Sequence, residues 1–144
     1  MRDIKSRLGL VQLLEPQDAV TTDVASGVLD TWGFNGAMLA VLVGTITGVG
    51  ATAYLTPVLE HSDTLVGEDF EAVDAAEISG AFTKIDATNE DQLVQSVGYT
   101  GSKRYLRVNL DFTGTVTATL VAVLGIVGRP RVLPAVAPAV KAAT

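Results

Sequence analysis

The chain has 144 residues, no cysteine and a net charge of −6 at pH 7, and 48% of its residues are hydrophobic while only 6% are aromatic. This length suits one domain with its own hydrophobic core, and the lack of cysteine excludes disulfides and thiolate metal sites. The longest apolar stretch, residues 37–43, is far shorter than the roughly 20 residues of a membrane-spanning helix. We therefore expect no membrane partner.

Acidic and basic residues are segregated along the chain. Between Glu15 and Asp91 the only base is Lys84, whereas the other bases lie near the two ends and in residues 103–107. Such asymmetry favours docking onto protein surfaces. It argues against nucleic acid, because an acidic body repels phosphates and the sequence lacks a basic stripe with interleaved aromatics.

Residues 1–18 are predicted to form an N-terminal arm. Its apolar residues Ile4, Leu8, Val11 and Leu14 recur every three to four positions, which allows one short amphipathic helical face. The arm either packs on its own domain or docks on a neighbouring molecule. The segment lacks the pattern of a signal peptide, so we expect the protein to be made in the cytoplasm.

Residues 19–128 have the pattern of an all-β domain. Residues 38–46 are nearly all apolar, which predicts a strand buried on both faces. Residues 52–59 alternate and place Leu55, Pro57 and Leu59 on one face. Because proline cannot donate to a ladder, this strand must lie at a sheet edge or contain a bulge at Pro57.

The clearest strand covers residues 104–112, with Leu106, Val108, Leu110 and Phe112 predicted to point inward. After a turn at Gly114, residues 116–127 are predicted to continue this inner face with Ala118, Leu120, Ala122, Leu124 and Ile126. About eight strands at regular spacing predict a two-layer antiparallel β-sandwich, jelly-roll-like, with extended N- and C-terminal arms.

Residues 60–77 are acidic but lack the spacing of a calcium-binding loop, so we expect a solvated loop face and no metal. The only histidine, His61, lies in the run Glu60-His61-Ser62-Asp63. Neighbours on a strand point to opposite faces, so this run cannot form a nucleophile, base and orienting acid. We expect an exposed loop histidine, no catalytic residue, no cofactor and no enzyme activity.

The aromatic residues leave one alternative open. Trp32, Tyr54, Tyr99 and Tyr105 could form a platform for a sugar, or they could fill the core and an interface. Scattered over separate predicted strands, they favour the second interpretation.

Residues 129–144 are predicted to form an extended Pro/Ala-rich tail, because three prolines within nine residues exclude a helix. Val132, Leu133 and Val136 gain little from exposure to water. We expect the tail to lie on another chain; a disordered tail and a tail packed on its own sandwich are the alternatives.

Four segments carry a resemblance to a known group of proteins: DIK at residues 3–5, TPVLEHSD at 56–63, GYTGSKRYLRV at 98–108 and GRP at 128–130. In these segments the sequence resembles small proteins encoded in the head modules of tailed bacteriophages and prophages. The resemblance implies a capsid decoration, or cement, protein: a β-sandwich on the outer surface of the virion that binds the major capsid protein, commonly as a homotrimer. The family brings no catalytic residues.

The chain ends are then expected to contact the capsid or adjacent protomers. The residues expected to make these contacts are Arg2, Ile4, Lys5, Leu8, Val11, Leu14, Arg129, Arg131, Val132, Leu133 and Val136. Two alternatives remain: another virion part, such as a head fibre, tail or baseplate subunit, and a carbohydrate-binding β-sandwich used in host attachment.

Overall fold

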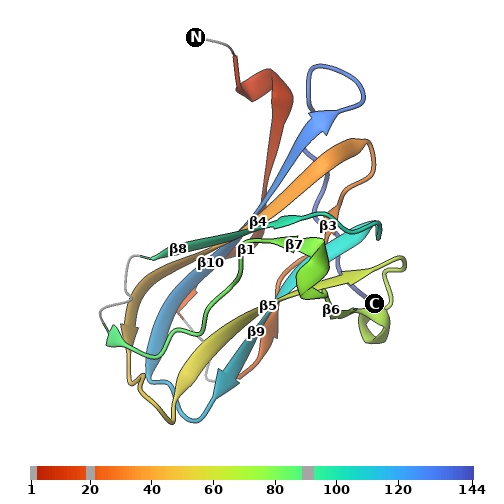
Figure 1. Cartoon of the computed structure of the whole chain (residues 1–144). Helices are drawn as coiled ribbons and strands as arrows, with labels where there is room; N and C mark the ends of the chain where they lie inside the picture. Colours follow the sequence, from red (N-terminus) through yellow and green to blue (C-terminus); the bar gives the residue numbers. More distant parts are fainter. Residues whose placement is uncertain (1–2, 19–21, 89–92) are drawn as a thin grey trace.

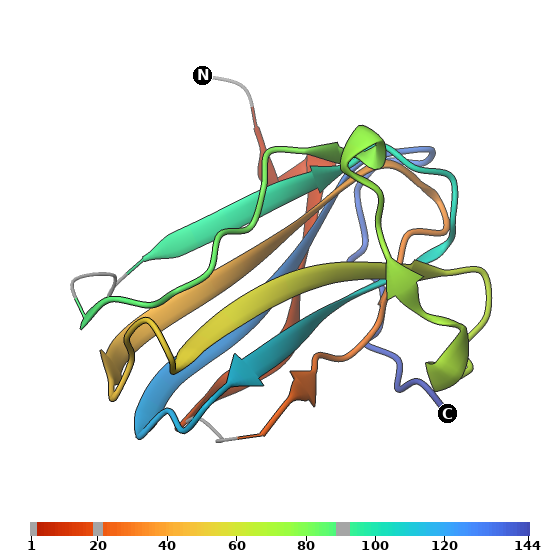
Figure 2. The ribbon, with the colours of Figure 1, turned by 60° about the horizontal axis from the view of Figure 1, so that its bottom comes forward.

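Two antiparallel five-stranded sheets form the protein, and their inner faces enclose one main hydrophobic core (Figures 1 and 2). The computed structural model describes residues 3–18, 22–88 and 93–144. The predicted all-β, two-layer antiparallel sandwich is confirmed. Each helix in the described part of the chain is a single 3₁₀ turn, so none of these helices could cross a membrane.

The sheets have simple strand orders. Sheet A consists, in order, of β1 (Leu8–Asp18), β10 (Ala118–Pro130), β4 (Phe34–Thr47), β8 (Val94–Tyr99) and β7 (Ile78–Ser79). Sheet B consists of β2 (Val24–Ala25), β9 (Tyr105–Thr113), β5 (Tyr54–Ser62) and β6 (Glu71–Ala72), and β3 (Leu29–Asp30) also pairs with β9. The 3₁₀ turns are η1 (Lys5–Arg7), η2 (Gly67–Asp69) and η3 (Ala75–Glu77).

The alternation predicted for β9 and β5 is confirmed. Leu106, Val108 and Leu110 of β9 are fully buried, as is Leu55 of β5. Pro57 pairs with Leu110 of β9, but on its other side β5 pairs with β6 only at residues 60 and 61. Leu55 and Leu59 form backbone hydrogen bonds on that other side, so alternation places the nitrogen of Pro57 there too. Pro57 therefore occupies a local sheet edge, as its chemistry requires.

The predicted inner face of β10 is wrong. Val121, Val123 and Val127 lie in the core, whereas Leu120 is 44% exposed on the opposite face. Both alternating sets of β10 are apolar, so hydrophobicity cannot distinguish them, and a register shift of one residue exchanges the faces.

The predicted burial of β4 on both faces is also wrong. Leu39 and Val41 are fully buried, but Met38 and Leu42, which point the other way, are only half-buried. Within the described part of the chain, the sandwich supplies one covering layer for β4, and its outer side has none.

The N-terminal segment is mostly strand, not a helical arm. After η1, β1 pairs with β10 from Leu8 opposite Gly128 to Asp18 opposite Leu120. The register is irregular between Gln12 and Leu14 and between Leu14 and Gln17. These irregularities break the two-residue alternation of the strand, which explains why the apolar spacing indicates a helix.

The C-terminal tail folds back onto its own domain (Figure 1). The structure therefore differs from the expectation that the tail lies on another chain. Val28 and Lys141 exchange two backbone hydrogen bonds of 2.7 and 3.1 Å, and Thr144 bonds to Leu65 and Gly67. Glycine makes this close approach feasible: a Cβ at Gly27 would collide with Cγ1 of Val140 and lie 3.0 Å from the carbonyl oxygen of Leu13.

We expect Gly27→Ala to loosen the tail. The added methyl group displaces Val140 and lowers the free energy of unfolding by about 2 kcal/mol, the usual cost of overpacking. Urea denaturation measures the loss, and amide exchange at Val28 and Lys141 locates it. Gly50→Ala is the matched control, because a Cβ at Gly50 meets no atom within 4 Å. Equal effects of the two substitutions would contradict the proposed role of Gly27.

Candidate functional site

Segments from both chain ends meet at one end of the sandwich, where η1 lies beside the turn that follows β10 (Figure 1). The amide of Ala135 donates a 2.8 Å hydrogen bond to the carbonyl oxygen of Ser6. Leu8 and Leu133 line a cavity of about 450 Å³ in this region. We use the term chain-end patch for the following residues: Ile4, Lys5, Leu8, Arg129, Arg131, Val132, Leu133 and Val136.

The apolar members of the chain-end patch are strongly exposed. Val132 is 79% and Val136 77% exposed, and Ile4 and Leu133 are also more than half exposed. These side chains add little to the hydrophobic core, although nearby backbone hydrogen bonds hold their segment in place. They are therefore available to a partner.

The patch is also basic, in a chain whose net charge is −6. Among the described residues, no carboxylate forms an ion pair with Lys5, Arg129 or Arg131. Arg129 has a φ of 52°, a left-handed conformation that is unfavourable for a residue with a Cβ. The fold therefore holds an unpaired guanidinium on strained backbone, a combination often found at binding sites.

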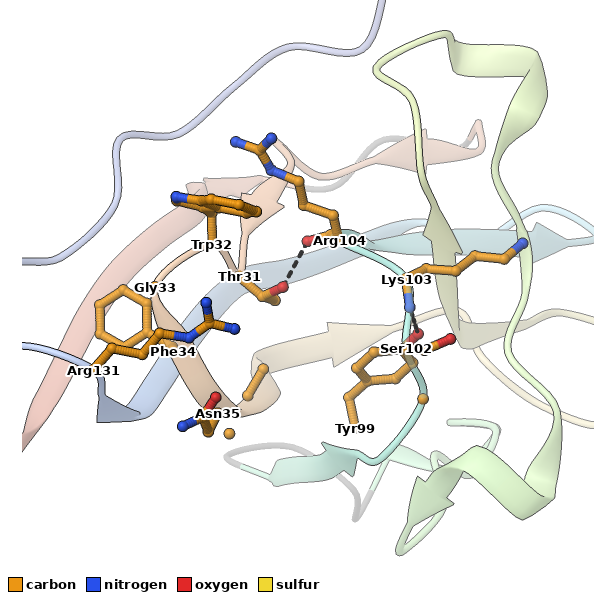
Figure 3. Close-up of a pocket in the computed structure, with 13 residues that line it drawn as sticks. Thr31, Trp32, Gly33, Phe34, Asn35, Tyr99, Ser102, Lys103, Arg104 and Arg131 are labelled. Carbon is orange, nitrogen blue, oxygen red and sulfur yellow. Dashed lines mark hydrogen bonds between the residues drawn. The ribbon is translucent and has the colours of Figure 1, made fainter.

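A pocket of about 380 Å³ lies next to the patch, and Arg131 lines it (Figure 3). Trp32, which is 68% exposed, also lines the pocket. The guanidinium carbon of Arg104 is 5.0 Å from the centre of the Trp32 ring, and that of Arg131 is 5.9 Å away. An exposed aromatic face with two cations can bind a flat or ring-shaped ligand by stacking.

Asp30 holds Arg104, Lys141 and the backbone of Trp32 in place through hydrogen bonds. Its carboxylate accepts two 2.8 Å hydrogen bonds from Arg104 and one of 2.7 Å from Nζ of Lys141, and the Trp32 amide donates to it at 3.0 Å. Burial alone raises the pKa of Asp30, but the hydrogen bonds from Arg104 and Lys141 outweigh burial and hold this pKa well below its usual value. One buried carboxylate thus ties the pocket to the C-terminal tail.

The four aromatic residues considered from the sequence do not form one platform. Trp32 and Tyr99 line the same pocket, but Tyr105 is buried and Tyr54 pairs with Thr113 at the far end of β5. The hydroxyl of Tyr99 already accepts a 2.9 Å hydrogen bond from the amide of Lys103. Trp32 is therefore the aromatic residue most available to a ligand.

The prediction of an exposed His61 is wrong, because this residue is buried at the end of β5. Its Nδ1 lies 2.9 Å from the hydroxyl oxygen of Tyr99, and the carboxylates of Glu71 and Glu77 lie 3.7 and 3.8 Å from the ring nitrogens. The hydroxyl of Ser62 accepts a hydrogen bond from the amide of Thr64, whereas the ring of His61 contacts Tyr99. In the described ranges, no group of three His, Cys, Asp or Glu residues could hold a metal ion.

The structure brings together most of the residues expected to contact a partner, but not all. Val11 is buried in the core and Leu14 packs against it, because β1 belongs to sheet A. Arg2 lies outside the described residues. Sequence reasoning missed the link between Trp32, Arg104 and Asp30. The turn signal at Gly33 next to an isolated tryptophan was the available clue.

Comparisons with known proteins add little. No protein-family model matches the sequence, and no curated protein matches it either. The chain is similar to a solved structure described as dimeric latent PorU from Porphyromonas gingivalis, with 10% sequence identity and a TM-score of 0.39. The match covers 86% of this chain but 13% of the PorU chain, so this chain spans a small part of that length. A likeness of this degree carries no argument about function.

We expect Asp30→Asn to destabilise the protein by about 2 kcal/mol. This is less than the cost of breaking a fully buried ion pair, because Arg104 and Lys141 are partly exposed. The contribution of Asp30 is complete above about pH 4, the ordinary pKa of aspartate, and is lost as the pH falls through the lowered pKa of the folded protein. Urea denaturation from neutral pH to about pH 2 should show the wild-type and Asp30→Asn curves converging in acid.

The control for this measurement is Asp86→Asn, which removes a partly exposed ion pair with Lys84. Its effect should stay below about 1 kcal/mol. A difference in unfolding free energy between wild type and Asp30→Asn that stays constant down to the lowest pH would contradict the lowered pKa assigned to Asp30.

Proposed function

We propose that the protein is a non-enzymatic structural part of a tailed-bacteriophage virion, where it decorates the outer surface of the capsid and stabilises the shell by binding the major capsid protein. The proposal rests on the sequence resemblance and on one structural observation. Unpaired basic groups and exposed apolar side chains from both chain ends meet at one end of an otherwise acidic sandwich.

The chain-end patch combines the two properties that a protein-docking surface needs. Its apolar side chains gain free energy when they leave water. Its unpaired bases can orient the acidic molecule as it approaches a surface. A protein that binds only the assembled lattice shifts the equilibrium towards assembly, and repetition over many sites makes a modest contact effective.

The folded tail changes how this contact works. The sequence favours a stiff, extended tail that lies on another chain. In the structure, hydrogen bonds from residues 135, 141 and 144 already hold the tail. A preformed patch loses less conformational entropy on binding than a free tail does. The proposed contact is therefore a surface and not a flexible arm. Self-association as a homotrimer, which the resemblance implies, remains part of the proposal.

We expect the double substitution Val132→Asp and Val136→Asp to abolish retention on capsid shells that lack this protein. Both side chains are highly exposed, so the fold should be unaffected while the docking surface loses apolar area and gains repelling charge. Co-sedimentation of the purified protein with the shells measures binding. Val66→Asp is the control, because Val66 is exposed beside η2, away from the patch. Retention of the double variant at the wild-type level would refute the role of the patch.

Mass spectrometry of purified virions tests the wider proposal. A decoration protein should be present at a copy number close to that of the major capsid protein. Absence from the particle would overturn the proposal, and presence in tails alone would favour a tail or baseplate subunit.

A second candidate function is carbohydrate binding during host attachment, which the exposed Trp32 at a pocket specifically favours. Stacking of a sugar ring on Trp32, with Arg131 beside it, requires no catalytic group. On a glycan array this candidate predicts a signal that Trp32→Ala removes and that the Val132 and Val136 substitutions leave intact. The capsid proposal predicts no glycan signal, so the array separates the two functions.

A further inference from the structure

The outer faces of the two sheets differ sharply in chemistry. On sheet B, Glu60 and Arg107 form a 2.6 Å ion pair, and Asn109 and Asp111 continue the polar row along β9. On sheet A, β4 and β8 contain no charged residue, and β10 contains none before Arg129. Antiparallel sandwiches usually expose polar residues on their outer faces. Sheet B follows this rule and sheet A does not.

The strand register of sheet A gathers its outward side chains into one surface. Met38 lies between Ile126 of β10 and Gly98 of β8, and Leu42 lies between Ala122 and Val94. We define the outer apolar face by the apolar residues that point outward from four neighbouring strands: Leu10, Met38, Ala40, Leu42, Val94, Leu120, Ala122, Leu124 and Ile126. The same register places two uncharged polar residues, Gln12 and Ser96, on this side.

This face is not closed by its own chain. Leu10 is 65% exposed, and Val94 and Leu120 also remain exposed. Leu42, Val94 and Leu120 line an apolar groove of about 310 Å³. The C-terminal tail follows a different route, past Gly9 and Gly27 to η2. No described segment therefore crosses the face.

The size of the face matches what a stable contact between proteins needs. The shortest of the four strands, β8, has six residues, whereas β1, β10 and β4 have 11, 13 and 14. With strands about 4.8 Å apart and an average of about nine paired residues per strand at about 3.3 Å each, the face measures about 500 Å². Two such faces in contact bury about 1,000 Å², which is the lower limit for a specific interface. A patch of this size is at the upper end of the range for the largest apolar patch on a soluble monomer, and such patches are often binding surfaces.

The charge distribution indicates which partner covers the face. Two copies of this chain each carry a net charge of −6, so contact through an uncharged surface brings the fewest like charges close together. The outer apolar face is that surface, and it needs no complementary charge on its partner. Flat sheet faces also pack well on each other, about 10 Å apart. Two acidic residues, Glu15 and Asp18, belong to the edge strand β1, and Asp18 pairs with Leu120 of β10.

We propose that another copy of this chain covers the outer apolar face, so that the protein is a homo-oligomer whose copies meet through sheet A. The inference deepens the self-association included in the proposed function and assigns it to a surface separate from the chain-end patch. A rotation axis parallel to the strands would leave the charged face of sheet B outside and present every chain-end patch to the same side. Such an arrangement suits a complex that sits on a shell.

The test is the mass of the purified full-length protein in solution, measured by sedimentation velocity over a range of concentrations. Wild type should have a mass of two or three chains of 15.0 kDa each. Leu120→Glu should shift the protein to a single chain and raise the dissociation constant at least about a hundredfold, because it buries like charges in an apolar contact. Val94→Glu, on the neighbouring edge of the groove, should do the same.

The matched control is Val66→Glu, because Val66 is 45% exposed and Leu120 is 44% exposed. This control should keep the oligomer, and circular dichroism should show that all variants remain folded. Raising the salt concentration from about 0.1 M to about 1 M should leave an uncharged interface intact. A wild-type protein that is a single chain at all concentrations, or an oligomer that Leu120→Glu and Val94→Glu leave unchanged, would overturn the proposal.

Shell binding separates this inference from the proposed function. If wild type is oligomeric and sensitive to Leu120→Glu but does not bind shells, the capsid role fails and the interface stands. If wild type is a single chain and Leu120→Glu abolishes shell binding, the outer apolar face belongs to the capsid contact and the proposed self-association through it is wrong.

Discussion

The ladder between β4 and β10 is the constraint on which the rest of this structure depends. It runs from Ala118 opposite Thr47 to Pro130 opposite Phe34, and both strands carry apolar residues at nearly every position. A strand points alternate residues to opposite sides. Because Leu39, Val41, Val121 and Val123 are buried in the core, the residues between them must point outward, and in this sequence most of those are apolar too. The core and the outer apolar face follow from one pairing.

The C-terminal tail couples the candidate site to the fold. Lys141 joins the tail to Asp30, and Asp30 in turn holds Arg104 against Trp32. The same tail places Val132 and Val136 beside η1 through the hydrogen bond between Ala135 and Ser6. The pocket and the chain-end patch are thus parts of one end of the sandwich, and a change in the docking of the tail would affect both.

The sequence predicts the fold well where polar and apolar residues alternate, as in β9, and poorly where they do not. In β10 both faces are apolar, so only the tertiary packing decides which one is buried. In β1 the irregular register hides the strand, although pairing with β10 forms it. The pocket depends on Asp30 and Arg104, which are 74 residues apart, and no local pattern brings them together. The basic and apolar composition of the chain ends is visible in the sequence, but neither the pairing of β1 in sheet A nor the path of the tail is.

An uncharged outer sheet face carries a cost for a protein that works alone, because exposed apolar strands promote aggregation. Nothing in the packing of the core requires Leu120 or Val94 to be apolar, since polar residues at outward positions would preserve the same ladder. Their apolar character therefore indicates a working state in which the face is covered. Sheet B, with its ion pair and polar row, faces the solvent, and the basic end remains free for a different partner. The chain thus separates its surfaces by chemistry: an apolar face, which we propose for contact between copies, a basic end, which we propose for docking, and a charged face on sheet B.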